Sequence, residues 1–116
     1  MSTNYYLKYN ICECCNRFDK IHIGKSSAGW QFVFRGHGED FMPVLQTYDQ
    51  WMDFIENQLY EETAKIVNEY GKEIEYQEFI NMVKEKQENP KNKVHNFTAY
   101  NYIDVRGYNF CSTQFS

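Results

Sequence analysis

Cysteine and histidine side chains near the start of the chain could bind a metal ion. Cys12 and Cys15 form a C-x-x-C pair, a spacing at which one tight turn presents both sulfurs to a single tetrahedral ion. His22 follows seven residues after Cys15, and His37 lies further along. A closed zinc site needs four ligands. The sequence therefore predicts zinc bound by Cys12, Cys15, His22 and His37, in a structural role, because nothing nearby resembles the glutamate general base of a zinc hydrolase.

This ligand set has alternatives. Cys111 and His95 are alternative fourth ligands, and Cys12 with Cys14 is an alternative cysteine pair. The cysteines are otherwise interpreted as buried thiols without a metal. The first residues lack the basic and apolar regions of a signal peptide, so we expect the chain to stay in a reducing cytoplasm, where disulfides are rare.

A second candidate site is the polar loop after His22. Gly24-Lys25-Ser26-Ser27 is similar to the end of a phosphate-binding P-loop, but Asp19 stands where the full pattern needs its first glycine. We therefore exclude an NTPase and keep a weaker hypothesis, that the loop holds a small anionic ligand such as a nucleotide. The alternative is an ordinary polar turn. The predicted ligand-binding residues are Lys25, Ser26, Ser27, Trp30 and Arg35.

Catalysis by these residues is the less favoured interpretation. His22, Ser26 and Cys14 are of types that serve as base or nucleophile. Their spacing does not show that any of them lies within reach of another. The sequence therefore favours a non-enzymatic protein.

Composition restricts the partners. The chain has 116 residues, 42% of them hydrophobic and 18% aromatic, with a net charge of −4 and a pI near 5.3. General nucleic-acid binding is not expected, because it normally requires a basic face. A local basic patch around Arg17, Lys20, Lys25 and Arg35 remains compatible with that charge. No run of about 18 apolar residues occurs, so we expect no membrane span.

Hydrophobic periodicity predicts the elements that would position these residues. Strands are expected at 5–11, 20–25 and 29–35, and Trp30, Phe32 and Phe34 would share one face of the last. Helices are expected from Thr47 to about 61 or 62 and from about 74 to 88, before the Asn89-Pro90 breaker. Residues 65–69 fit either a helix or a strand. Two further strands flank Arg106-Gly107.

These elements predict one α+β domain over residues 1–116. It comprises a cysteine knuckle and hairpin at 12–35, a helical part at 47–88, and C-terminal strands at 94–116. The predicted fold is a small antiparallel sheet of about four strands, with two helices packed on one face and a zinc-knuckle-like turn near the N-terminus.

Residues 12–34 resemble a family of small proteins encoded by bacteriophages. The resemblance rests on Cys12-x-x-Cys15-x-Arg17 and on the block His22-Ile23-Gly24-Lys25-Ser26-Ser27-Ala28-Gly29-Trp30-x-Phe32, and continues more loosely through Glu69-Tyr70-Gly71, Glu78-Phe79, Gly107-Tyr108-x-Phe110 and Phe115-Ser116. It implies a phage accessory protein in the cytoplasm of an infected bacterium, with Cys12, Cys15 and His22 as ligands.

We therefore expect a non-enzymatic protein, stabilised by zinc, that binds and modulates a host component such as a defence protein through a protein–protein surface. Carboxylates on the first helix, including Asp49, Asp53 and Glu56, would supply an acidic surface for this. The alternative is sequestration of a small anionic ligand, such as a signalling nucleotide, by the Lys25-Ser26-Ser27 loop. A small hydrolase or nucleotide-processing enzyme is the least favoured.

Overall fold

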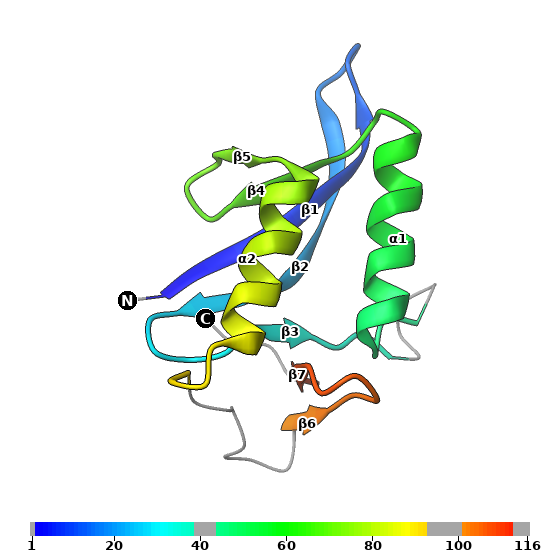
Figure 1. Cartoon of the computed structure of the whole chain (residues 1–116). Helices are drawn as coiled ribbons and strands as arrows, with labels where there is room; N and C mark the ends of the chain where they lie inside the picture. The colour runs from blue at the N-terminus through cyan, green and yellow to red at the C-terminus, as the bar shows by residue number, and fades with distance from the viewer. Residues whose placement is uncertain (1, 39–43, 93–100, 113–116) are drawn as a thin grey trace.

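The fold is built on one mixed sheet of seven strands (Figure 1). A computed structural model describes residues 2–38, 44–92 and 101–112. The strands are β1 (Ser2–Cys12), β2 (Arg17–Ser27), β3 (Val33–Arg35), β4 (Lys65–Asn68), β5 (Glu73–Ile74), β6 (Asn101–Ile103) and β7 (Asn109–Cys111). Their order is β5-β4-β1-β2-β3-β7-β6, with β3 and β7 parallel and every other neighbouring pair antiparallel.

The prediction of a small antiparallel sheet of about four strands was wrong. β3 to β7 contain only two to four residues each. Alternation of apolar and polar residues identifies a strand reliably only over longer runs. These short strands form because they pair with segments that are distant in the sequence. Their own residues therefore do not identify them as strands.

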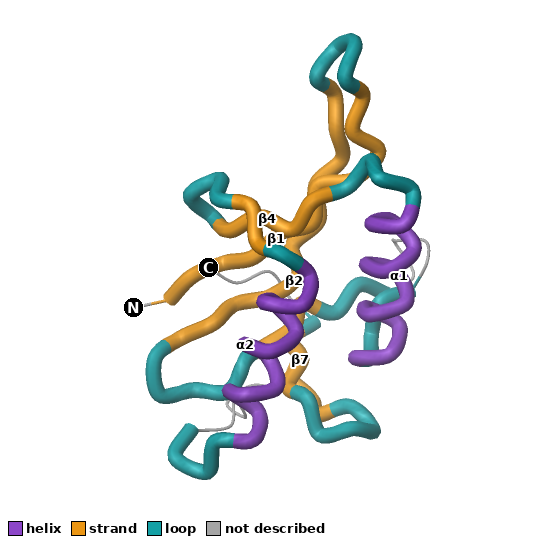
Figure 2. The backbone as a smooth tube through the Cα atoms, turned by 45° about the horizontal axis from the view of Figure 1, so that its top comes forward, coloured by secondary structure: helices purple, strands orange, loops and turns teal. Residues whose placement is uncertain are grey.

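β1 and β2 form a long hairpin that carries the candidate residues. Its end projects beyond the body of the molecule, as Figure 2 shows, and is closed by the turn at residues 13–16. Asn10 (φ 54°) and Asn16 (φ 56°) take left-handed conformations there, which asparagine tolerates better than most residues. The predicted zinc-knuckle-like turn is thus the exposed tip of a hairpin.

β3 is shorter than the predicted strand 29–35. Trp30 lies in the turn before it and is partly exposed, whereas Phe32 and Phe34 are buried. Gly24 of β2 is pressed against this segment. A Cβ atom at position 24 would lie 2.5 Å from the Phe32 ring and would also clash with the Val33 carbonyl. Glycine is therefore required where β2 and β3 approach each other.

The two predicted helices are present: α1 spans Tyr48–Tyr60 and α2 spans Tyr76–Glu88. Thr47 caps α1, its Oγ1 accepting a hydrogen bond from the Gln50 N–H at 3.2 Å. Residues 65–69, for which the sequence allowed either a helix or a strand, contain β4. At the start of α2, Phe79 lies in the buried core cluster, and Ile74 is partly buried against that cluster.

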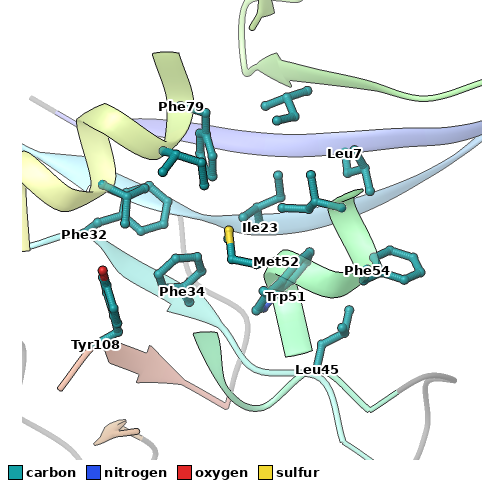
Figure 3. Packing of buried hydrophobic residues seen from close by; sticks show 14 of the residues in the cluster. Leu7, Ile23, Phe32, Phe34, Leu45, Trp51, Met52, Phe54, Phe79 and Tyr108 are labelled. Carbon is teal, nitrogen blue, oxygen red and sulfur yellow. The ribbon is translucent and has the colours of Figure 1, made fainter. Parts of the chain in front are cut away.

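Both helices pack on one face of the sheet and enclose an aromatic core (Figure 3). Phe34 lies near its centre, stacked on Phe110 with ring centroids 5.1 Å apart. Phe79 contacts Phe32 edge-on at 5.7 Å. Trp51 is fully buried, and its indole N–H donates to the Arg35 carbonyl at 2.9 Å. This bond ties α1 to the end of β3.

The C-terminal hairpin of β6 and β7 agrees with the two strands predicted around Arg106-Gly107. Gly107 has φ +87°, a conformation that suits glycine. Of the predicted 94–116 segment, residues 101–112 are described; His95, Phe115 and Ser116 lie outside the described residues. Within the described ranges, neither helix is long and apolar enough to cross a membrane.

Candidate functional site: a dithiol tip and a basic sheet face

Three cysteines occupy the tip of the β1–β2 hairpin. Cys12 ends β1 and is partly exposed, while Cys14 and Cys15 are exposed in the turn. The side chains and the backbone N–H groups of both Cys15 and Cys14 donate hydrogen bonds to the Cys12 sulfur. These bonds, the Cys15 thiol contributing most, lower the pKa of Cys12 from its ordinary value. Both neighbouring cysteines of the turn therefore favour the thiolate form of Cys12.

The hairpin separates these cysteines from His22. Cys12 pairs with Arg17, and His22 lies five residues further along β2, paired with Tyr6. At about 3.3 Å per residue, the strand places His22 roughly 16 Å from the tip. Zinc ligands must all lie within about 2.3 Å of the ion. Among residues 2–38, 44–92 and 101–112, no group of three or more histidine, cysteine, aspartate or glutamate side chains could hold a metal. The predicted set of Cys12, Cys15, His22 and His37 is not assembled in this structure.

His37 has a structural contact instead. Its Nε2 lies 3.2 Å from the His22 carbonyl, and its ring meets Trp51 edge-on at 5.8 Å. β3 pairs with β2 only at Gly24 and Lys25, so the His22 carbonyl lies beyond that ladder. The His22 carbonyl therefore accepts a hydrogen bond from the His37 side chain rather than from the backbone of β3. Cys111, the alternative fourth ligand, is buried in β7.

His22 is partly buried and held as neutral imidazole. Its Nε2 lies 3.0 Å from Asn4 Oδ1 and 3.2 Å from the Gly24 carbonyl. A carbonyl only accepts, so Nε2 carries the hydrogen. Burial lowers the pKa of His22 to about 4, with a smaller lowering from the positive charges of Arg35, His37 and Lys25 and partial opposition from the Gly24 hydrogen bond. The charge contributions show that the surroundings of His22 are electropositive.

His22 belongs to the face of the sheet turned away from the helices. On β1, Tyr5, Leu7 and Tyr9 contact the core, so the alternate residues point to the opposite side. Cross-strand partners share a face, which extends the assignment to the neighbouring strands. We call this surface the basic face. Its cationic and aromatic residues are Tyr6, Lys8, Phe18, Lys20, His22, Lys25, Arg35 and Lys65, and it also carries Glu73, which lies opposite Val67.

Three lysines lie side by side across the basic face. Lys8 on β1 is directly opposite Lys20 on β2 and directly opposite Lys65 on β4. Like charges in these positions destabilise a sheet. The Lys8 ammonium lies 4.5 Å from the centre of the Phe18 ring, and the Lys20 ammonium lies 4.3 Å from that of Tyr6. Lys65 contacts Glu73 at 3.7 Å.

Aromatic rings continue this row toward His22. Tyr6 stacks on the His22 imidazole with centroids 4.9 Å apart and planes inclined by 26°. The Phe18 ring is 45% exposed. Tyr6 is therefore contacted by both Lys20 and His22, whereas Phe18 beside Lys8 is an exposed aromatic side chain of this row.

The predicted ligand loop divides between this face and a structural turn. Lys25 and Arg35 lie on the basic face, where Arg35 also donates to the carbonyl oxygens of Gly36 and Ser112. The Ser27 and Trp30 carbonyls instead accept hydrogen bonds from the Lys86 ammonium, at 2.7 and 3.3 Å. Ser26 pairs with Thr3 in the ladder between β1 and β2. The structure therefore does not gather all five predicted residues around one point.

Tyr6, Lys8 and Phe18 are candidate residues that the sequence interpretation missed. The signal was present in the alternation of Phe18, Lys20 and His22, which places the three side chains on one face of a strand. The pairing of β1 with β2 then adds Tyr6 and Lys8 to that face.

The carboxylates of α1 are partly engaged in other contacts. Asp49 Oδ1 accepts a hydrogen bond from Arg106 Nε at 2.7 Å, and Glu56 Oε1 accepts one from the Tyr76 hydroxyl at 2.8 Å. Two of the three acidic groups expected to form a partner surface are thus held by neighbouring residues of the same chain.

The fold and its site define a single-sheet α+β protein with both helices on one side and a basic, aromatic surface on the other. Comparisons with protein-family models, with curated proteins and with solved structures give no match.

Proposed function

We propose that this chain is a non-enzymatic binding protein that holds a nucleotide, free or within a single strand, on the basic face. The observation that carries the proposal is the row of directly opposed lysines, Lys20, Lys8 and Lys65, beside the exposed side chain of Phe18. An anionic group bound above this row offsets the repulsion among the ammonium groups. Binding of an anion is therefore more favourable, because it reduces the repulsion among these lysines that destabilises the free protein.

A nucleotide suits this surface better than a simple anion. Its phosphates match the lysines, and its base offers a flat face to the exposed side chain of Phe18. Stacking of a base on an aromatic side chain contributes about 1–3 kcal/mol and does not depend strongly on which base is present. Neutral His22, with Lys25 and Arg35 nearby, supplies further polar contacts at the other end of the face.

The setting we propose follows the resemblance of residues 12–34 to phage-encoded proteins. An accessory protein in an infected bacterium would then sequester a signalling nucleotide or bind a strand exposed during infection. Bound zinc in the form expected from the sequence is not part of this proposal, because its four ligands lie apart.

A host protein is the second candidate partner. The observation in its favour is that α1 carries Asp49, Asp53 and Glu56 and no lysine or arginine. The contacts of Asp49 and Glu56 with Arg106 and Tyr76 weaken this interpretation, because those carboxylates would have to leave existing partners to bind a basic protein. We therefore rank the nucleotide above the protein partner.

The test is calorimetric titration with mononucleotides and, separately, with a short single-stranded oligonucleotide. The key variant combines Lys8→Gln with Lys20→Gln. A matched control combines Lys84→Gln with Lys91→Gln, which removes the same charge from exposed positions away from the basic face. We expect binding by the wild type and the control and at least about tenfold weaker binding by the key variant, equivalent to about 1.4 kcal/mol.

Comparing the two ligands shows whether the protein binds free nucleotides or nucleotides within a single strand. Binding of mononucleotides identifies a sequestration protein, whereas binding of the strand alone, weakening steeply with salt, identifies a single-strand binder. Absence of binding by either ligand, or equal loss in the key variant and the control, would overturn the proposal and promote the host-protein candidate.

A further inference from the structure

The strongest remaining feature is one edge of β2, where the hairpin projects from the body of the molecule (Figure 2). β1 pairs with one edge of β2, whereas β3 pairs with the other edge only at Gly24 and Lys25. Within residues 2–38, 44–92 and 101–112, no strand pairs with that second edge from Arg17 to Ile21. A strand edge with unpaired backbone groups is a template for pairing with another chain.

The backbone of this edge is oriented for such pairing. The His22 carbonyl accepts a hydrogen bond from His37, which follows β3, so this carbonyl points away from β1. Backbone groups of alternate residues in a strand point to the same edge. The N–H and carbonyl groups of Phe18 and Lys20 therefore also point outward, and no described residue bonds to them there. They are available to a further strand.

The side chains at this edge are exposed and have bonding capacity left. Arg17, Phe18, Asp19 and Lys20 are all exposed. In the described part of the chain, Arg17 forms no ion pair, and Asp19 accepts a single hydrogen bond, from Asn10 Nδ2 to its Oδ2 at 2.9 Å. Arg17 and Asp19 are two residues apart, so a cation and an anion lie on the same face of the strand.

We propose that two copies of this chain pair antiparallel through these free edges, with Phe18 opposite Phe18 of the second copy. Two identical antiparallel strands related by a two-fold axis place one residue opposite its own copy. A pair centred on Arg17, Asp19 or Lys20 would place like charges directly opposite each other, which destabilises a sheet. Among these four exposed residues, only a centre at Phe18 avoids this repulsion. It also places Arg17 of each copy opposite Asp19 of the other.

This register satisfies the backbone and both faces of the sheet. Phe18 exchanges two hydrogen bonds with its copy, since its N–H and carbonyl both point outward. The two Phe18 rings meet on the basic face, and the two pairs of Arg17 with Asp19 lie on the opposite face. Lys20 comes opposite Asn16, which is neutral. Because the pairing is antiparallel and the hairpin projects, the bodies of the two copies extend in opposite directions (Figure 2).

The interface is small. The paired segment comprises residues 16–20 of each copy, which is much less than a standard protein–protein interface contains. The dimer is therefore weak and forms as the protein concentration rises. Its two-fold axis is perpendicular to the sheet, so the basic faces of both copies lie side by side on the same side of one continuous sheet.

The test is analytical ultracentrifugation of the full-length protein at concentrations up to about 1 mM, which detects complexes as weak as about 4 kcal/mol. Reductant excludes disulfides between copies through the exposed cysteines. Nucleotide is omitted because Phe18 also belongs to the basic face, so the result does not depend on the proposed function. We expect the wild type to shift from monomer to dimer as its concentration rises.

Charge reversal tests the register. Arg17→Glu and Asp19→Lys should each weaken the dimer at least about tenfold, because each places like charges opposite each other. The variant with both substitutions should regain the wild-type dissociation constant to within about threefold, because both ion pairs form again with reversed charge. Lys84→Glu is the matched control for Arg17→Glu, since it makes the same change in charge at an exposed position on α2.

A second measurement locates the interface without any substitution. Amide NMR shifts should change with concentration at Phe18 and Lys20, whose N–H groups point outward, and less at Ile21, whose N–H points to β1. A protein that stays monomeric over the whole range overturns the inference, as do shift changes confined to another surface. Equal effects of Arg17→Glu and Lys84→Glu, or a folded double variant that does not regain the dimer, overturn it as well.

Discussion

The low pKa of His22 predicts that the folded protein loses stability as the pH falls from about 6.5 to about 4. Its ordinary value is 6.5, and in the fold it is about 4. Between these values the unfolded chain binds a proton at His22 and the folded chain does not. Acidification therefore favours the unfolded state throughout this window. Above the window His22 is neutral in both states, and below it His22 is protonated in both, so the loss stops growing.

The size of this loss follows from the shift, reduced for solvent exposure. One pKa unit corresponds to about 1.4 kcal/mol, so the full shift would correspond to about 3.4 kcal/mol. The imidazole is only partly buried, and water around an exposed group screens much of such an effect. We therefore expect a loss of about 1–2 kcal/mol, which exceeds the error of a denaturant titration.

The assay compares urea unfolding of the wild type and His22→Gln at several pH values across the window. The difference between the two free energies of unfolding removes contributions from other titrating groups. We expect that difference to shrink by about 1–2 kcal/mol on going from neutral pH to pH 4. A difference that does not depend on pH, or a His22 pKa near 6.5 by NMR, would refute the reasoning.

The same titration also tests the proposed ligand. A phosphate bound near His22 would counter the positive charges of Lys25 and Arg35, which lower the pKa of the imidazole. Saturation with the bound nucleotide should therefore raise that pKa, as followed by the ring proton shifts. A ligand that binds without changing the His22 pKa does not lie at this end of the basic face.

Three further substitutions test the packing that supports the face. Gly24→Ala should cost at least about 2 kcal/mol of stability and disturb the β2–β3 pairing, because the added methyl meets the Phe32 ring at 2.5 Å; a stable variant with unchanged amide shifts would contradict this. Asp104→Ala should cost about 1–3 kcal/mol, since its Oδ2 accepts the Tyr48 N–H at the start of α1, and thermal unfolding measures it. Lys86→Met should raise amide exchange in the turn after Ser27, whose carbonyl it binds at 2.7 Å; unchanged protection would show the turn to be stable alone.

Local sequence signals predicted the helices and the turn at the cysteines. The cap at Thr47, the spacing of apolar residues in α1 and α2, and the Asn89-Pro90 breaker all act within a few residues, and the helices lie where they indicated. The C-x-x-C spacing likewise predicted a tight turn at the cysteines, and residues 13–16 form a turn.

The rest of the site depends on pairing between distant segments. β3 joins the sheet through parallel pairing with β7, about 75 residues further along the chain. Nothing in three residues of sequence specifies that contact. The predicted zinc ligands are not brought together for a related reason: β2 continues along the hairpin and carries His22 away from the turn that holds Cys15.

The separation of charge between the two layers explains how an acidic chain can carry a basic site. α1 contributes three carboxylates and no cation, while the opposite face of the sheet gathers lysines from β1, β2 and β4. Beyond the Debye length of about 8 Å, salt screens an approaching anion from the positive charge of the lysines. The net charge of the protein, −4, does not attract an anion either. A mononucleotide bound as proposed, above Lys8, Lys20 and Lys65, would lie within the Debye length of the lysines. Its binding is therefore expected to weaken as the ionic strength rises, because salt shortens the range over which the lysines act.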